Sequence, residues 1–196
     1  MKNIITISRE FGSGGGTIGK MVAERLGYEY YDKDLIFKTA AKANMSPDEA
    51  IKLDENLSHG FGFGQSLFNH YSSPLDEKLY ETQKKVIREF AEKGNCVIVG
   101  RNANAILAEF DATLHVFISA NPNWRVKYLK ADKMKDMPED KIMAHLQKID
   151  KARQKYCSYF TNTEFGVAKY YDVCLYSSVV GIDKCVDILE ELAKNK

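Results

Sequence analysis

The chain has 196 residues, which suits a single domain that can bury a core without disulfides or metal ions. Hydrophobic residues make up 44% of the sequence and charged residues 28%, ordinary values that exclude a disordered or collagen-like chain. The formal net charge of +1 gives no reason to expect nucleic acid or an acidic membrane as a partner.

Short apolar runs without polar alternation predict strands that are covered on both faces of a parallel sheet. In chain order, the predicted strands are Asn3–Ser8, a weaker Tyr28–Tyr31, Cys96–Gly100, Leu114–Ser119 and Asp172–Tyr176. Helical periodicity predicts helices over Thr17–Leu26, Leu75–Glu92, Trp124–Met134, Glu139–Tyr159 and Ile182–Ala193. Strands that alternate with helices in this way predict a doubly wound α/β fold.

The segment between the second and third strands departs from this alternation, because about sixty residues are too many for one crossover helix. Helical patterns lie near Asp34–Ala43 and Pro47–Asp54. In Asn56–Ser73, glycine alternates with phenylalanine, which disfavours a helix and predicts a mobile loop. Further along, the stretch from Arg125 to Lys155 is rich in lysine and arginine, a pattern most typical of a solvated helix face.

The cysteines and the N-terminus indicate the compartment. The opening MKNIITISREFG lacks the pattern of a signal peptide, and no segment reaches the roughly 18 apolar residues of a membrane span. Neither a disulfide framework nor a zinc site is expected of the widely spaced Cys96, Cys157, Cys174 and Cys185. These features favour reduced, mostly buried thiols in a cytoplasmic protein.

The strongest chemical signal is the glycine-rich segment ISREFGSGGGTIGK, which leaves the first strand and enters the first helix. Glycines let backbone N–H groups wrap a phosphate, and the helix N-terminus adds the positive end of its dipole. The residues expected to bind phosphate are Gly12, Ser13, Gly14, Gly15, Gly16 and Thr17.

One match to a known anion-binding pattern is superficial. Gly14, Gly16 and Gly19 satisfy the dinucleotide fingerprint G-x-G-x-x-G, with Asp32 downstream where a ribose-binding acid belongs. That fingerprint places its first glycine at the strand end, whereas Arg9–Ser13 intervene here. The dinucleotide interpretation is therefore disfavoured.

A phosphate-binding P-loop can be aligned in two registers. Residues 14–20 satisfy G-x-x-x-x-G-K, but Met21 follows where a Ser or Thr should hold magnesium. Counting from the strand instead puts Gly15 at the usual lysine position and Thr17 at the usual hydroxyl position, and we prefer this register. The loop then lacks the lysine that bridges the β- and γ-phosphates, and Arg9 is the nearest replacement charge.

Segments along most of the chain carry a resemblance: ITISREFGSGGG, AERLG, YYDKDLI, GNCVIVGRNANAIL, HVFISANPNWRV, KIDKARQKYCSYFT and YDVCLYSSVVGID. With these the chain resembles the cytidylate kinase-like family, a branch of the P-loop nucleoside monophosphate kinases; only Met45–Glu77 has no match. The resemblance implies a P-loop NTPase-type three-layer sandwich in one domain, with a five-stranded parallel sheet flanked by helices. It also implies an acceptor-binding insertion near Lys33–Lys93 and a lid near Lys135–Lys169.

The implied activity is ATP-dependent phosphorylation of a nucleoside monophosphate, with CMP or dCMP favoured by the resemblance. ATP is the implied donor, and the implied Mg²⁺ bridges its phosphates in contact with Thr17. The expected partners are nucleotide substrates alone, neither nucleic acid nor membrane, and the oligomeric state stays open.

The resemblance also implies acceptor-side roles. The segment DKDLIFK is similar to one that helps to hold the acceptor nucleotide, so Asp32 and Lys38 are expected to bind substrate. Gly100, Arg101 and Asn102 match a Gly-Arg-Asp motif that grips the acceptor phosphate, with an amide in place of the acid. The nucleobase is therefore left in doubt.

The remaining implied roles belong to the lid and the donor site. Asp150 and Arg153 match the lid pattern D-x-x-R, and Ser177 lies in the turn expected beside the donor base. Arginine suits phosphoryl transfer because its planar fork neutralises charge that spreads over the equatorial oxygens. The expected catalytic cations are Arg153, Lys151, Arg101 and Arg9, and Arg125 and Lys148 are further lid candidates. Structural ion pairs are the alternative for these side chains.

Two other functions remain open. The missing lysine favours a nucleotide-binding protein that has lost catalysis and acts as a sensor or scaffold. A kinase acting on another small phosphorylated or hydroxylated metabolite is the second alternative. If the protein only binds nucleotides, a lysine restored at Gly15 is expected to rescue part of the catalysis.

Overall fold

The computed structural model describes residues 2–32 and 74–195, and its centre is a five-stranded sheet in the order β2-β3-β1-β4-β5. The strands are β1 (Ile4–Arg9), β2 (Glu29–Tyr31), β3 (Cys96–Val99), β4 (Thr113–Ser119) and β5 (Val173–Tyr176). Every neighbouring pair runs parallel. The predicted α/β class with five parallel strands is confirmed.

The helices follow the predicted pattern. They are α1 (Gly15–Leu26), α5 (Pro74–Lys93), α6 (Ala103–Ile106), α7 (Pro122–Ala131), α8 (Glu139–Phe160), α9 (Ser177–Val180) and α10 (Ile182–Lys194), with a 3₁₀ turn at Ala168–Tyr170. Helices α6 and α9 were not predicted, because four residues are too few to show a helical period. The patterns near Asp34–Ala43 and Pro47–Asp54, and the loop predicted at Asn56–Ser73, lie outside the described residues.

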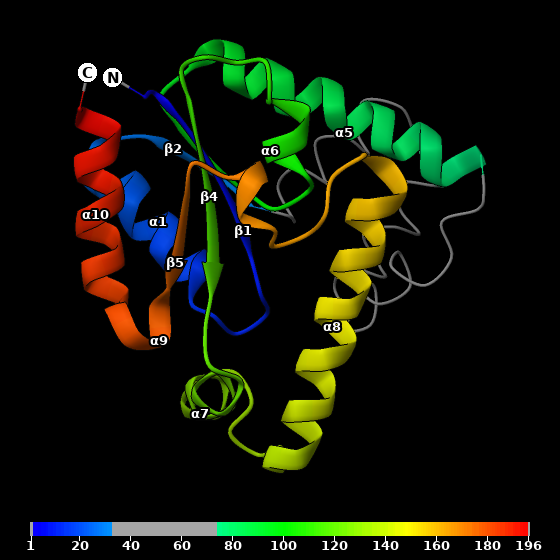
Figure 1. Ribbon diagram of the computed structural model, residues 1–196, viewed down its shortest axis with the longest axis vertical. Coiled ribbons are helices and arrows are strands. Elements are labelled where there is room, and N and C mark those ends of the chain that lie inside the picture. The colour runs from blue at the N-terminus through cyan, green and yellow to red at the C-terminus, as the bar shows by residue number, and fades with distance from the viewer. Residues whose placement is uncertain (1, 33–73, 196) are drawn as a thin grey trace.

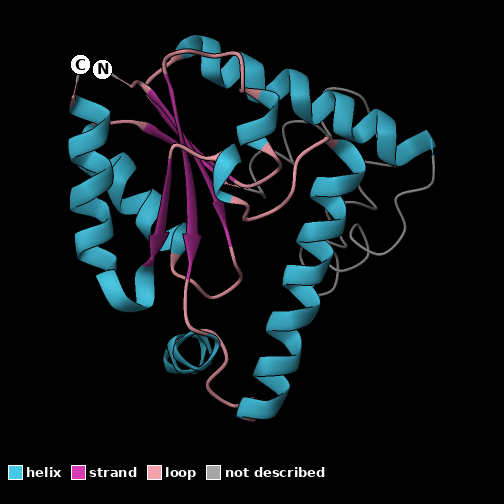
Figure 2. Ribbon diagram, viewed as in Figure 1, coloured by secondary structure: helices cyan, strands magenta, loops and turns pink. Residues whose placement is uncertain are grey.

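Side chains that alternate along the strands build a three-layer sandwich (Figures 1 and 2). On β1, Ile5 and Ile7 face a core shared with α1 and α10, and both are fully buried. Ile4 faces the opposite core, which contains side chains of α5, α6 and α8. Each face of the sheet is therefore covered by helices, as the continuous apolar strands predict.

The carboxyl ends of the strands meet at one edge of the sheet because all the strands are parallel. The glycine-rich segment follows β1 there, and Gly100, Ala120 and Ser177 follow β3, β4 and β5. Helix α7 lies at this edge, and α8 rises from it beside the sheet (Figure 1). In open α/β sheets, ligands bind outside this edge.

Two further expectations can be compared with the structure. All four cysteine thiols are free, and Cys96, Cys157 and Cys185 are buried, which agrees with the predicted thiols. Among the helices described, none combines the length and apolarity needed to cross a bilayer.

His115 on β4 makes stability depend on pH. Its Nδ1 is 2.8 Å from Thr6 Oγ1 on β1, and burial lowers the pKa of the imidazole, with Asp172 opposing and Lys2 assisting. The unfolded chain therefore binds more protons once the pH falls below about 6.5, so stability is lost on acidification. We expect the Tm to fall between about pH 7.5 and about pH 5.5, and to fall less in His115→Gln. An equal fall in both proteins, measured by thermal unfolding, would contradict this.

Candidate functional site

Left-handed glycines bend the loop between β1 and α1. Gly12 has a φ of 75° and Gly14 a φ of 79°. A Cβ at Gly12 would lie 2.9 Å from Leu129 Cδ1 of α7, and a Cβ at Gly14 would overlap Ile182 Cδ1 of α10. Both positions therefore require glycine for conformation and for space.

The N-terminus of α1 presents amide groups that no carbonyl of its own helix accepts. The residue capping the helix is Gly14, and the Ile18 N–H donates to the Gly14 carbonyl at 2.9 Å. Helix geometry leaves the preceding N–H groups, those of Gly15, Gly16 and Thr17, without a carbonyl of the same helix. These amides and the helix dipole can hold an anion, as the glycine-rich sequence predicts.

Two buried serines hold the loop to the sheet. The Ser13 hydroxyl donates to the Glu10 carbonyl at 2.9 Å and to the Ile118 carbonyl at 3.1 Å. The Ser177 hydroxyl donates to the Ser13 carbonyl at 2.6 Å and to the Ser119 carbonyl at 3.2 Å. Both serines are 0% exposed, so their side chains position the loop from within the protein. The donor-base contact that the sequence suggested for Ser177 is not available to its hydroxyl here.

An ion pair grips the loop at Phe11. Asp150 Oδ1 accepts the Phe11 N–H at 2.7 Å, while Arg125 Nη1 donates to the Phe11 carbonyl at 3.1 Å. Arg125 Nη1 also donates to Asp150 Oδ2 at 2.6 Å, and both side chains are buried. We call these three contacts the Phe11 clamp. Beside it, Glu10 accepts the Ala120 N–H at 3.0 Å and lies 3.9 Å from Arg125 Nε.

Arginines converge on the loop from several elements. Arg153 of α8 is half-buried, and its Nη1 donates to the Arg9 carbonyl at 2.6 Å. Burial lowers the pKa of the Arg153 guanidinium well below its ordinary value, Asp150 opposes this, and three like charges add to it: Arg9, Arg101 and Arg125. We call these four arginines the arginine cluster. Such crowding of positive charge suits a site for a polyanion.

Backbone strain positions Arg101. Gly100, Arg101 and Asn102 have φ values of 86°, 57° and 54°, and the left-handed region costs non-glycine residues about 1–3 kcal/mol each. The Arg101 side chain is buried, and its Cζ is 5.6 Å from the Tyr156 ring centroid of α8. Asn102 Nδ2 donates to the Tyr156 carbonyl at 3.5 Å. The turn after β3 therefore aims Arg101 at Tyr156 of α8.

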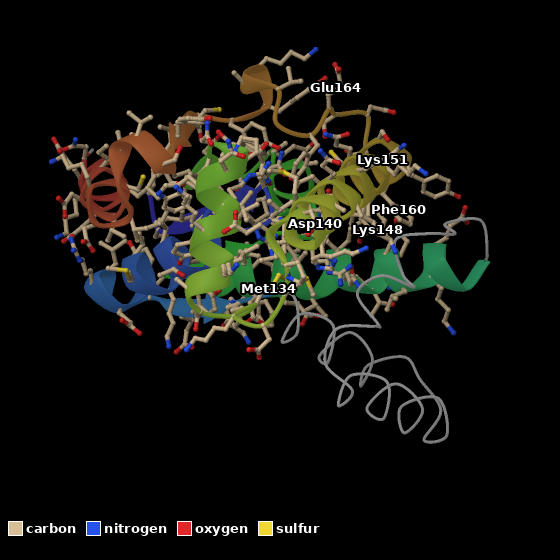
Figure 3. All side chains as sticks on the ribbon, turned by 90° about the horizontal axis from the view of Figure 1, so that it is seen from below. Met134, Asp140, Lys148, Lys151, Phe160 and Glu164 are labelled. Atoms are coloured by element: carbon tan, nitrogen blue, oxygen red, sulfur yellow. The ribbon has the colours of Figure 1, made fainter. Side chains whose placement is uncertain are left out.

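Other sequence-predicted residues lie elsewhere. Lys148 and Lys151 are exposed on α8 (Figure 3). At about 100° per residue, Lys151 projects roughly 160° around the helix from Arg153, so the two do not share a face. Asp32 is half-buried directly after β2, and Lys38 lies outside the described residues.

An aromatic pair beside Thr17 was missed from the sequence. Thr17 is exposed, and its Oγ1 is 3.0 Å from the Tyr128 hydroxyl of α7. Tyr128 stacks on Trp124, with ring centroids 4.9 Å apart and planes 10° apart. The signal that could have revealed the pair is the i,i+4 spacing of the two aromatic residues on a predicted helix.

Comparisons with known proteins agree with this architecture. Residues 4–179 match the sequence profile of the cytidylate kinase-like family. A cytidylate kinase of Chlamydia caviae is 28% identical over 179 residues, which span 76% of this chain and 81% of the relative. An uncharacterized protein from Eubacterium ventriosum has a TM-score of 0.76 and 25% identity, covering 98% of this chain and 99% of its own. A gluconokinase from Sinorhizobium meliloti, 14% identical with a TM-score of 0.58 over 99% and 95% of the two chains, shares the fold.

The Phe11 clamp generates a stability prediction. Asp150→Ala removes the closer carboxylate from buried Arg125 and leaves it only Glu10 at 3.9 Å, which should lower the free energy of unfolding by about 3 kcal/mol in urea denaturation. Asp140→Ala is the matched control: it removes an exposed acid from the first turn of the same helix and should cost less than about 1 kcal/mol (Figure 3). Similar small losses in both variants would show that the clamp does not hold the loop.

Proposed function

This chain belongs to the cytidylate kinase-like family, and we propose that it transfers the terminal phosphoryl group of ATP to a nucleoside monophosphate. CMP and dCMP are the favoured acceptors, because the curated relatives are cytidylate kinases. The observation that carries the proposal is the arginine cluster: Arg125 and Arg153 donate to the backbone at Phe11 and Arg9, and Arg101 lies close enough to Arg153 to affect its charge.

The physical chemistry of the reaction supports this assignment. Phosphoryl transfer requires two anionic substrates held in line, and neutralisation of the charge on the transferred group. Within the cluster, Arg125 is paired with Asp150 in the Phe11 clamp. We assign the phosphate contacts to Arg9, Arg101 and Arg153, the three members of the cluster that the sequence predicts as catalytic cations.

On the donor side, the amides of Gly15, Gly16 and Thr17 fit the ATP phosphates. The Thr17 hydroxyl, which is exposed, fits Mg²⁺, because this ion keeps several waters and binds largely through substrate phosphates. The described residues contain no group of three or more His, Cys, Asp or Glu able to hold a metal ion, so Thr17 is the proposed contact. When bound, the ion would neutralise charge on the donor phosphates.

On the acceptor side, we propose that Arg101 binds the monophosphate, with Asp32 and Lys38 contacting the nucleotide. The residues 33–93 insertion would then enclose the acceptor, and residues 135–169 would act as the lid. Asp150 and Arg153, the two lid residues of the D-x-x-R pattern, contact the loop backbone in this structure. Lys151 remains a candidate for a substrate contact on the exposed side of α8.

A nucleotide-binding protein without catalysis is the second candidate, favoured by the glycine at position 15. A coupled assay for ADP release, run over all nucleoside monophosphates with and without magnesium, decides between the two. The proposed function predicts magnesium-dependent ADP release with at least one monophosphate, CMP or dCMP first. ATP binding with no turnover on any acceptor would favour the binding protein.

Arg153→Ala tests the transfer role of α8. Because a cation that stabilises the transition state contributes about 10³-fold or more, kcat should collapse while ATP affinity changes little. Lys155→Ala removes an exposed cation from the same helix and should leave kcat unchanged. Steady-state kinetics and calorimetry provide both numbers, and an active parent indifferent to Arg153→Ala would refute the assignment.

Arg101→Ala tests the acceptor site. Loss of a charge-assisted contact should weaken acceptor binding about ten- to a hundredfold, with ATP affinity nearly unchanged. Arg88→Ala, an exposed arginine on α5, serves as the control. Equal losses for donor and acceptor would indicate that Arg101 only maintains the strained turn.

A further inference from the structure

The Arg9 side chain crosses two glycine positions. A Cβ at Gly15 would lie 2.6 Å from Arg9 Cβ and 2.9 Å from Arg9 Cγ. A Cβ at Gly100 would overlap Arg9 Nη1 and lie 3.0 Å from Arg9 Cζ. The stem of Arg9 therefore packs against the start of α1, while its guanidinium lies against the turn after β3.

The Arg9 side chain occupies the space that the missing lysine would need. In the register we prefer, that lysine belongs at Gly15. A lysine there would begin where the Arg9 stem already lies, so the two side chains exclude each other in this arrangement. Because the nearest of these atoms is the Cβ of Arg9, glycine at position 15 is required by any side chain at position 9, that of arginine included.

The guanidinium also lies at the boundary between donor and acceptor residues. β1 and β3 are neighbours, and the Gly100 N–H donates to the Ile7 carbonyl at 3.0 Å. Gly100 directly precedes Arg101, whereas the Arg9 stem lies beside the first helical residue of the glycine loop. Arg153 fixes the Arg9 backbone through its 2.6 Å bond to the carbonyl. The Arg9 cation therefore lies against the turn that carries Arg101, on a stem that packs beside the start of α1.

We infer that Arg9 takes the place of the missing lysine. From the end of β1 it supplies the positive charge for the β- and γ-phosphate oxygens that a lysine at position 15 would otherwise supply. This inference rests on the proposed function for its catalytic consequence. Its steric and ligand-binding consequences do not require turnover.

A purely structural role for Arg9 makes different predictions. If Arg9 only filled space above Gly100, a neutral side chain of similar length would replace it without affecting triphosphate binding. Arg9→Met keeps an unbranched apolar stem and removes the charge, so it separates packing from electrostatics.

The experiment is a double-mutant cycle with Arg9→Gly, which removes the colliding Cβ, Gly15→Lys and the combined variant, together with Arg9→Met. Melting temperature, ATP affinity by calorimetry, and kcat with the acceptor found for the parent are measured for each. Lys20→Ala is the control, because the rejected register makes Lys20 the loop lysine and the structure leaves it exposed.

The inference predicts that the effect of Gly15→Lys on ATP affinity is opposite in the two backgrounds. In the parent it should lower the melting temperature and ATP affinity, because the new stem collides with Arg9. In Arg9→Gly it should raise ATP affinity and kcat at least about tenfold, because the charge returns without the collision. Arg9→Met and Arg9→Gly should each weaken ATP binding about ten- to a hundredfold, with Lys20→Ala unchanged.

Three results would overturn the inference: Gly15→Lys equally tolerated in the parent and in Arg9→Gly, Arg9→Met binding ATP as tightly as the parent, or Lys20→Ala weakening ATP binding as Arg9→Gly is expected to. A parent that binds ATP but phosphorylates no acceptor refutes only the proposed function. The melting temperatures and ATP affinities still decide whether Arg9 takes the place of the lysine.

Discussion

The Phe11 clamp is the contact on which the rest of the site depends. One buried carboxylate accepts the loop amide, and one buried guanidinium holds the loop carbonyl, so Asp150 and Arg125 fix both polar groups of one backbone segment. They come from α8 and α7, two helices that otherwise pack through the apolar cluster around Leu146. The clamp therefore joins both helices to the loop after β1, and it brings Arg153, one helical turn along, onto the Arg9 carbonyl.

The site keeps like charges close together before any ligand binds. Burial and three neighbouring arginines disfavour the charged form of Arg153, and the turn at Arg101 adopts a costly left-handed backbone. An anion bound among these groups would offset the repulsion. Strain and charge crowding of this kind are typical of functional sites, where the surrounding fold over-determines the local geometry. Under the proposed function, catalysis and the stability of the loop are thus coupled through the same residues.

Local sequence patterns predicted the fold and the glycine loop well, because apolar runs, helical periods and glycine positions are local properties. The cytidylate kinase-like resemblance is also confirmed as a family assignment. Side-chain direction was harder to predict. The D-x-x-R pattern did not reveal that Asp150 and Arg153 reach the loop while Lys151 projects elsewhere, nor did the turn after β5 reveal that the Ser177 hydroxyl is buried under Ser13. These contacts join segments far apart in sequence, so no local pattern encodes them.

A crystal structure with a bisubstrate analogue, in which a cytidine and an adenosine are joined by one polyphosphate chain, tests the central claim most directly. The account predicts that the polyphosphate crosses from the amides of Gly15 and Gly16 to Arg101, with the guanidinium groups of Arg9 and Arg153 on its oxygens. A polyphosphate bound away from the loop, or bound there with the Arg9 and Arg153 guanidinium groups turned away from it, would contradict the claim.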